Sequence, residues 1–240
     1  MNLVVDSGNS AVKVGIFDDL ALQDKLSFDS WDDLGLFLEK TSHENVLMSS
    51  VKTDAQAILG RAVNAKKKFA LTSDLPLPIQ NRYSTPASLG MDRLAAVCGA
   101  RQLFPLHDCL VIDAGTCITY DFIDRSGNYL GGGISPGLKM RFQAVHTFTA
   151  KLPLVSPKAG IPLIGDSTER SIQSGIVNGM LAEIDGIVSR YQEKYPALKA
   201  ILCGGDTGFF ENQTKASIFA SPELVLIGLN SILLYNVNRS

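Results

Sequence analysis

A short strand-and-turn signal occurs twice in this chain of 240 residues. Residues 3–8 read LVVDSG, and residues 110–115 read LVIDAG. Each copy is an aliphatic run that ends in Asp, a small residue and Gly, which is typical of a buried strand followed by a tight turn. A further β-branched run follows each turn, at residues 12–17 and 118–123, so each copy predicts a β-hairpin. One copy would be common by chance, but two copies in the same setting indicate two related halves.

Strands and helices alternate along the rest of the chain. Further strands are expected at residues 45–51, 69–72 and 200–203. Apolar residues recur at helical spacing over residues 31–40, 54–68, 91–104, 138–149, 169–195 and 223–236. This alternation is typical of an α/β fold. Because no flexible linker separates the two repeated signals, we expect two closely packed domains, at residues 1–108 and 109–240.

The composition excludes several kinds of partner. The net charge is −2 and 19% of the residues are charged, so no basic surface for nucleic acid is expected. The four cysteines form no CxxC pair, which favours free thiols in a reducing compartment. The N-terminus lacks the pattern of a signal peptide, and the apolar segment at residues 224–234 is too short to span a bilayer. We therefore expect a cytoplasmic globular protein that binds neither nucleic acid nor membrane.

The repeated turn is suited to binding phosphate. It brings a carboxylate, Asp6 or Asp113, and several backbone N–H groups to one edge of a sheet. Such N–H groups bind phosphate oxygens, and Gly allows the phosphate to approach closely. The carboxylate can bind Mg²⁺ directly or through water. Two such hairpins that face each other across a cleft would hold a nucleotide.

This arrangement resembles the actin and sugar-kinase ATPase superfamily. The resemblance implies an α/β fold of two similar actin/ribonuclease-H-like domains with a nucleotide cleft between them. Residues 200–207, AILCGGDT, resemble the adenosine element of that superfamily, because a strand there runs into paired glycines. The alternative interpretation of this segment is a plain turn between a strand and a helix.

Five motifs narrow the resemblance to one family. They are DSGNSAVK (6–13), YSTPASLGMDR (83–93), DAGTCITYD (113–121), YLGGGISPGL (129–138) and GDSTERSIQSGIVNGMLAEIDG (165–186). Their order and spacing resemble type III pantothenate kinase, the first enzyme of coenzyme A biosynthesis in many bacteria, over essentially the whole chain. Ser10, Cys117 and Cys203 depart from the usual Thr, Ala and Thr. The resemblance implies ATP-dependent phosphorylation of the primary hydroxyl of pantothenate to 4'-phosphopantothenate.

The resemblance also implies roles for the two hairpins in binding ATP with Mg²⁺. The first hairpin would contribute Asp6, Gly8, Asn9, Ser10 and Lys13. For Lys13 the alternative is a solvated side chain on a strand. Thr116 of the second hairpin would offer a hydroxyl and an N–H to phosphate. Asp113 resembles the family residue that binds a monovalent cation, K⁺ or NH₄⁺, and the alternative is a second carboxylate on the magnesium side.

The resemblance places pantothenate beside the segment Gly90–Arg93, which includes Met91. Asp92 would be the catalytic base, and Arg93 offers a planar donor fork that suits the pantothenate carboxylate. The alternative for this Asp-Arg step is a helix cap or a salt bridge. Tyr83 and Thr168 resemble further substrate contacts, although Tyr83 could instead be a packed aromatic residue.

Other functions remain open from the sequence. The resemblance implies a homodimer, for which the helix at residues 172–187 offers an apolar contact face. A noncatalytic transcriptional accessory factor on the same fold is one alternative function. A kinase for another small molecule, such as a sugar or acetate, is the second. The presence of Asp6, Asp92 and Asp113 argues against the first of these, and the G-x-D-R segment argues against the second.

Overall fold

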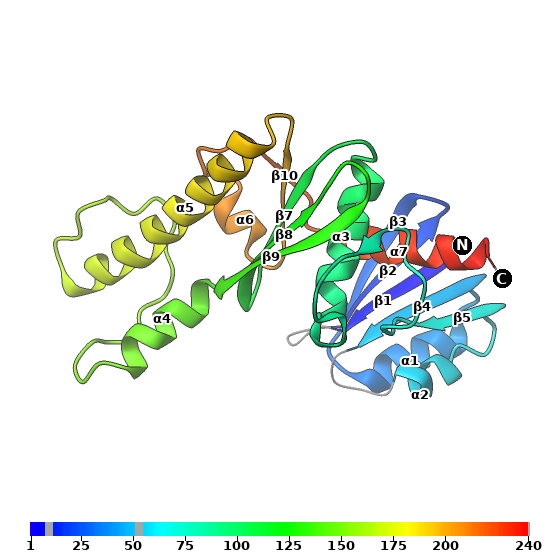
Figure 1. The fold of residues 1–240 in the computed structure, drawn as a ribbon. Helices are drawn as coiled ribbons and strands as arrows, with labels where there is room; N and C mark the ends of the chain where they lie inside the picture. The colour runs from blue at the N-terminus through cyan, green and yellow to red at the C-terminus, as the bar shows by residue number, and fades with distance from the viewer. Residues whose placement is uncertain (8–11, 51–54, 240) are drawn as a thin grey trace. The chain divides into compact units, whose positions relative to one another are not determined.

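The computed structural model describes residues 1–7, 12–50 and 55–239, and it divides into two compact units (Figure 1). The first unit comprises Met1–Pro105, Ser126–Tyr129 and Glu223–Ser240, and the second comprises Leu106–Arg125 and Leu130–Pro222. The C-terminal residues therefore group with the N-terminal unit. The two predicted domains, 1–108 and 109–240, stay a prediction.

The first unit is built on a five-stranded sheet of order β3-β2-β1-β4-β5. Its elements are β1 (Asn2–Ser7), β2 (Val12–Asp18), β3 (Ala21–Phe28), α1 (Trp31–Lys40), β4 (Asn45–Ser50), α2 (Ala55–Gly60), β5 (Lys67–Ala70), β6 (Gln80–Asn81), the 3-10 helix η1 (Pro86–Ser88), α3 (Met91–Leu103) and α7 (Leu224–Val237). Strand β1 pairs antiparallel with β2 and parallel with β4. The predicted first hairpin is therefore present, at the centre of the sheet.

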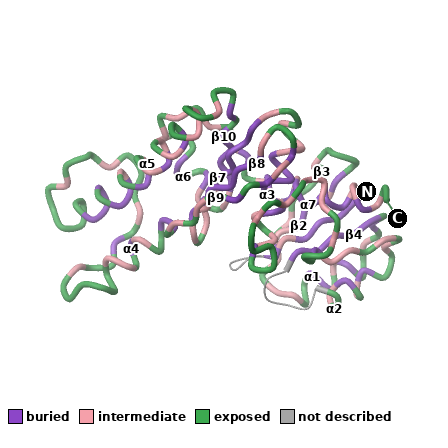
Figure 2. Tube along the Cα trace, in the orientation of Figure 1, coloured by how far each residue is buried: buried purple, intermediate pink, exposed green. Residues whose placement is uncertain are grey.

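Alternate side chains of β1 pack on opposite faces of this sheet. Leu3 and Val5 lie in a core with α1 and α2, whereas Val4 lies in a core with α3 and α7. The period of two residues along a strand produces this division. The buried segments in Figure 2 follow these strands and helices. Helices thus cover both faces of the sheet, and this packing holds β1 and its C-terminal end, which carries Asp6, in place.

Helices α3 and α7 pack against each other at two glycines. A Cβ atom on Gly99 would lie 2.3 Å from the carbonyl oxygen of Leu224, and one on Gly228 would lie 1.7 Å from that of Ala95. The two backbones are therefore in direct contact, as only glycine permits. This contact fixes α3, whose first turn carries the Gly90–Arg93 segment.

The second unit repeats the hairpin within a second sheet. Its elements are β7 (Cys109–Ala114), β8 (Cys117–Ile123), β9 (Asn128–Pro136), α4 (Leu138–Thr147), α5 (Thr168–Lys194), β10 (Lys199–Cys203), α6 (Thr207–Phe210) and β11 (Ile218–Ala220). The strand order is β11-β10-β7-β8-β9. The first two residues of β9 belong to the first unit, where they pair in parallel with β6.

The core of the second unit lies between its sheet and helices α4, α5 and α6. Leu110, Ile112 and Ala114 of β7 contribute to it from the sheet. From α5 it includes Ile172, Ile176, Val177, Met180, Ile184 and Val188. The apolar side of α5, which the sequence suggested as a contact face between subunits, is thus used inside this unit. Of the helices in the described ranges, none is long and apolar enough to cross a membrane.

Candidate functional site

The first hairpin places Asp6 opposite Lys13 on adjacent strands. Burial raises the pKa of the Asp6 carboxyl to about 6; Lys13 opposes this shift, and the negative charge of Asp92 adds to it. Asp6, Lys13 and Asp92, three predicted site residues, all belong to this unit. Gly8, Asn9 and Ser10 lie outside the described residues.

Asp92 lies in the first turn of α3, two residues after Gly90 at the N-cap. Its carboxylate is exposed and accepts a hydrogen bond from the backbone N–H of Arg93 at 2.9 Å. A Cβ atom on Gly90 would lie 2.4 Å from Oδ1 of Asp92, so glycine leaves the space that this carboxylate occupies. The bond to the Arg93 N–H fits the capping interpretation, and the exposure of the side chain leaves it accessible to a ligand.

An aromatic stack lies beside this turn. The guanidinium carbon of Arg93 lies 5.7 Å from the centre of the Tyr83 ring, and Tyr83 stacks on Tyr129 with 6.0 Å between ring centres. Tyr129 is fully buried, while Tyr83 and Arg93 are half-buried. A cation over a ring face is attracted by the ring quadrupole. The structure therefore brings Tyr83 and Arg93 together, whereas Met91 packs against the apolar core.

The second hairpin has its carboxylate at the matching position. Asp113 pairs with Thr119 across the hairpin and with Cys203 of β10 on the other side. The N–H of Gly115 donates to the carbonyl of Cys117 at 3.0 Å and closes the turn. Thr116 is exposed at the tip of that turn. Its hydroxyl is therefore open to a ligand.

The paired glycines after β10 lie directly against Asp113. Gly204 has φ of +93°, and a Cβ atom there would lie 2.3 Å from Oδ1 of Asp113. The N–H of Asp206 donates to the carbonyl of Ala114 at 2.9 Å. The AILCGGDT segment and the second hairpin thus form one continuous backbone surface within this unit.

Sequence reasoning did not select Asp206 as a site residue. Burial raises the pKa of its carboxyl, against the opposing charge of Lys139. Its position one residue after the paired glycines was a signal that could have identified it. Asp206 and Lys139 belong to the same unit as Asp113, and the backbone of Asp206 contacts Ala114, the residue next to Asp113.

Thr168 is the first residue of α5 and is exposed. The N-cap of this helix is Ser167, whose hydroxyl accepts from the N–H of Arg170. Arg170 also forms an ion pair with Asp166 at 2.7 Å. The Thr168 side chain therefore lies exposed at a capped helix terminus, and within the described part of its own unit no hydrogen bond or ion pair joins it to Asp113 or Thr116.

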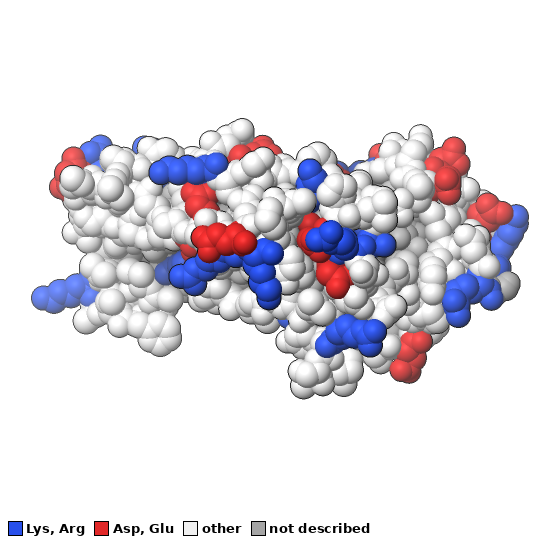
Figure 3. Space-filling model, turned by 45° about the horizontal axis from the view of Figure 1, so that its top comes forward, with Lys and Arg blue, Asp and Glu red and all other residues white. Residues whose placement is uncertain are grey.

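Charge alone does not mark the site. Basic and acidic side chains are interspersed over the face that Figure 3 shows. Among residues 1–7, 12–50 and 55–239, no group of three or more His, Cys, Asp or Glu side chains is arranged to hold a metal ion.

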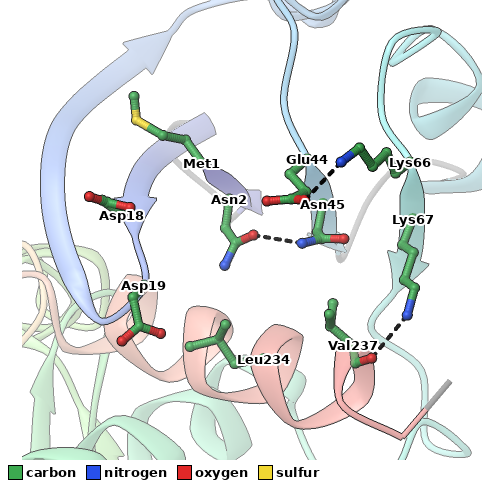
Figure 4. A pocket seen from close by; sticks show the side chains of 10 residues that line it. All are labelled: Met1, Asn2, Asp18, Asp19, Glu44, Asn45, Lys66, Lys67, Leu234 and Val237. Carbon is green, nitrogen blue, oxygen red and sulfur yellow. Dashed lines mark hydrogen bonds and ion pairs between the residues drawn. The ribbon is translucent and has the colours of Figure 1, made fainter.

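A cavity of about 500 Å³ lies at the opposite edge of the first sheet (Figure 4). It lies at the start of β1, where the side-chain amide of Asn45 donates to Asn2 at 2.8 Å. Lys66 pairs with Glu44 across it, and Lys67 donates to the carbonyl of Val237. None of the residues that line it is a predicted site residue, because Asp6 lies at the other end of the same strand.

Comparison with known proteins adds to this geometry. The family model for type III pantothenate kinase matches residues 2–190. A type III pantothenate kinase of Phocaeicola vulgatus is 46% identical over 239 residues, which cover 98% of this chain and 99% of that protein.

Solved structures share the fold. A Campylobacter jejuni protein described as a "Baf family transcriptional activator" has a TM-score of 0.66 at 22% identity, covering 98% of this chain and 99% of its own. A ROK hexokinase from Thermus thermophilus has a TM-score of 0.50 at 12% identity, covering 98% and 99%. At these identities the likeness concerns the fold alone, and it confirms the predicted α/β fold.

The family match extends over most of the chain and includes the hairpin motifs around Asp6 and Asp113, the Gly90–Arg93 segment and Thr168. The resemblance predicted from the five motifs is thereby confirmed, and this chain belongs to the type III pantothenate kinase family.

Proposed function

We propose that this chain carries out the reaction of its family, ATP-dependent phosphorylation of pantothenate to 4'-phosphopantothenate, with Asp92 as the catalytic base. The observation that carries the assignment of Asp92 is its exposed position in the first turn of α3, within the Gly90–Arg93 segment of the family motif and in the same unit as Asp6. A base for phosphoryl transfer must lie near the group that binds the phosphates, and these two carboxylates come from different elements of one unit. Phosphoryl transfer requires little covalent work from a protein beyond positioning, charge stabilisation and acceptance of the hydroxyl proton.

The proposed step is an in-line displacement. The primary hydroxyl oxygen of pantothenate forms a bond to the γ-phosphorus of ATP, and the bond from that phosphorus to the β-γ bridging oxygen breaks. Asp92 accepts the hydroxyl proton on the carboxylate oxygen that does not bond the Arg93 N–H. ADP leaves with the electron pair of the broken bond. The exposure of Asp92 supports this role, because a substrate can reach it.

The residues around Asp6 fit Mg²⁺. The carboxyl of Asp6 is half-buried and its pKa is raised to about 6, so its ionised form is disfavoured in the free protein. A bound cation would stabilise the ionised form. Lys13 on the adjacent strand offsets only part of the pKa shift. Mg²⁺ prefers oxygen ligands and is commonly held by one or two carboxylates together with substrate phosphates. When bound, it would neutralise developing charge on the phosphate oxygens, and Asp6 would hold it there.

The stack of Arg93 on Tyr83 supports a pantothenate-binding role. Tyr83 holds the guanidinium plane beside the turn that carries Asp92. Arg93 could then donate to the carboxylate of pantothenate as a fork, which orients the opposite, hydroxyl end. Thr168 is proposed as a further pantothenate contact on the basis of the family motif and its exposure at the start of α5.

The surroundings of Asp113 suit a monovalent cation. Gly204 packs against both Oδ1 of Asp113 and the carbonyl oxygen of Ala114, since a Cβ atom there would lie within 2.5 Å of each, so two oxygen atoms lie near one point of the backbone. K⁺ or NH₄⁺ beside Asp113 would offset its charge next to the phosphates, while Thr116 donates to a phosphate oxygen.

The homodimer and the location in the cytoplasm are also part of the proposal. Phe148, Leu163 and Ile164 of the second unit are largely exposed, so apolar surface remains outside its core. The four cysteines are free, which suits a reducing compartment. Light scattering at micromolar concentration should give the mass of two chains; a monomer of full activity would contradict the dimer.

An ADP-release assay tests the function. Purified protein is supplied with MgATP and, separately, pantothenate, glucose, N-acetylglucosamine or acetate, each with and without potassium. We expect turnover with pantothenate alone among these acceptors. Turnover with a sugar or acetate would identify a different kinase, and no turnover with any acceptor would favour a noncatalytic factor.

A further inference from the structure

Four polar side chains form a connected network within the second unit. The hydroxyl of Tyr120 donates to Oε1 of Glu183 at 2.9 Å, and Nη2 of Arg141 donates to Oε2 of Glu183 at 2.6 Å. The same Nη2 lies 3.0 Å from the hydroxyl oxygen of Ser135. These residues come from β8, α5, α4 and β9, so the network joins four elements.

The ion pair at its centre is partly withdrawn from water. The side chains of Arg141 and Glu183 are 19% and 24% exposed, whereas Arg125, which pairs with Asp108 in the same unit, is 71% exposed. A fully exposed pair contributes little to stability, but breaking a desolvated pair leaves an uncompensated charge. Burial and the charge of Glu183 also raise the pKa of Tyr120 far above its ordinary value, so its hydroxyl keeps its proton and donates.

Arg141 also holds the backbone at the end of β9. Its Nε donates to the carbonyl of Pro136 at 2.8 Å. The next residue, Gly137, donates its N–H to the carbonyl of Thr116 at 3.2 Å. A Cβ atom on Gly137 would lie 2.3 Å from the carbonyl oxygen of Gly115, so these two backbone segments touch. The end of β9 therefore lies directly against the turn of the second hairpin.

The contacts form a closed ring. Thr116 contacts Gly137, the preceding residue Pro136 is held by Arg141, and Arg141 is held by Glu183. Glu183 in turn is held by Tyr120, which lies on the second strand of the same hairpin. Such a ring restrains the turn from both sides, because its supporting strand and its tip are tied to one pair of helices.

We propose that Arg141 and Glu183 are positioning residues for the Gly115–Thr116 turn and, through it, for ATP binding. Neither side chain contacts the reacting groups in this proposal; their effect passes through the Pro136 carbonyl and the Gly137 N–H. The inference rests on the proposed function to the extent that Thr116 binds phosphate. The alternative is that the pair only stabilises the packing of α4 on α5.

Three variants separate positioning from stability: Arg141→Met, Glu183→Leu and the double variant that carries both. Each single variant leaves one charge uncompensated and should lower the melting temperature, whereas the double variant should recover much of it. The double variant still lacks the bond to Pro136. We therefore expect the Kd for a nonhydrolysable ATP analogue, and the KM for ATP, to be about ten- to a hundredfold higher in all three.

The measurements include two controls. Arg125→Met removes the guanidinium of an ion pair at the start of β7, away from the hairpin turn, and should leave ATP affinity unchanged. Arg141→Lys keeps the charge but cannot present the same planar fork to Pro136 and Glu183, so stability should be retained while ATP affinity still falls. The KM for pantothenate should change much less than the KM for ATP in every variant.

The outcomes are distinct. A double variant that regains stability but not ATP affinity supports positioning. A double variant with wild-type affinity for the analogue, or loss of affinity that follows stability across the series, overturns it. Wild-type protein that binds the analogue but does not phosphorylate pantothenate would refute the proposed substrate, and the binding series would still decide the positioning role.

Discussion

Asp92, in the first turn of α3, lies within electrostatic range of Asp6, at the end of β1. Burial is the main cause of the raised pKa of Asp6, and the charge of Asp92 adds to it. A negative charge that raises the pKa of another carboxyl disfavours its ionised form. Bound MgATP would supply positive charge near Asp6, so we make separate predictions for the two residues.

Asp92→Asn should abolish most of the turnover while leaving nucleotide binding intact. Asparagine keeps the shape and can accept from the Arg93 N–H, but it cannot take the hydroxyl proton. Removing a general base typically costs about 10²–10⁴-fold in rate. We expect kcat to fall by this amount, with the Kd for an ATP analogue and the melting temperature near their wild-type values. Near-wild-type turnover would place the base elsewhere, and a large loss of stability would support a capping role.

Asp6→Asn should change how stability depends on pH. The folded-state pKa of about 6 exceeds the ordinary value of 3.8, so between these values the folded state binds more protons than the unfolded state. The contribution of Asp6 to the free energy of unfolding is therefore greatest below about pH 4 and is lost as the pH rises through 6. Urea unfolding of the nucleotide-free protein at several pH values measures this.

Comparing wild type with Asp6→Asn isolates the effect of the Asp6 carboxyl. Asp206, whose pKa is also raised, is present in both proteins and so contributes equally to each. The difference in unfolding free energy between variant and wild type should grow in favour of the variant from pH 4 to pH 7. The variant should also use MgATP poorly. A pH-independent difference would mean that Asp6 is not shifted in solution.

The sequence predicted the two hairpins better than the sheet edges. Both hairpins appear where the repeated signal placed them, because buried aliphatic strands that end in Asp-x-Gly depend on local chemistry. Strand β3 was not predicted, since its residues are mostly exposed and alternate weakly. The helix predicted at residues 54–68 was too long: α2 ends at Gly60 and Lys67 lies in β5. Lysines common at helix ends are also common on edge strands, and β5 is an edge.

Contacts between elements that are far apart in the chain could not be predicted from the sequence. The predicted terminal helix exists as α7, yet it packs on α3 of the first unit through Gly99 and Gly228. Neither glycine has a local signature that names its partner. The same limit applies to Arg141 and Glu183, which are 42 residues apart in sequence. Glu183 lies in the motif at residues 165–186, but nothing in that motif identifies Arg141 as its partner. The AILCGGDT segment was identified by family likeness, and its contact with Asp113 became visible only when β10 paired with β7.

Asp113→Asn should remove a response to monovalent cations. If Asp113 binds such a cation, wild-type activity should rise strongly when sodium is replaced by potassium or ammonium at constant ionic strength. The neutral amide would bind the cation poorly, so the variant should show similar, low rates in all three salts. An initial-rate series in the three chloride salts measures this. If wild type is equally active in sodium and potassium and the variant is unimpaired, Asp113 has no such role, and a magnesium-side carboxylate becomes the alternative.

Gly204→Ala should destabilise the second unit, whereas Gly205→Ala should not. Gly204 has φ of +93°, which costs an L-residue about 1–2 kcal/mol, and its new methyl group would lie 2.3 Å from Oδ1 of Asp113 and 2.5 Å from the Ala114 carbonyl oxygen. A methyl group on Gly205 meets nothing within 4 Å. Urea unfolding should therefore give a free energy lower by at least about 1–2 kcal/mol for the first variant. Because the methyl group would displace Asp113, Gly204→Ala should also lose the potassium response, and the Gly205 variant should keep it. Equal stability of the two variants would show that β10 does not bring Gly204 against Asp113 as described.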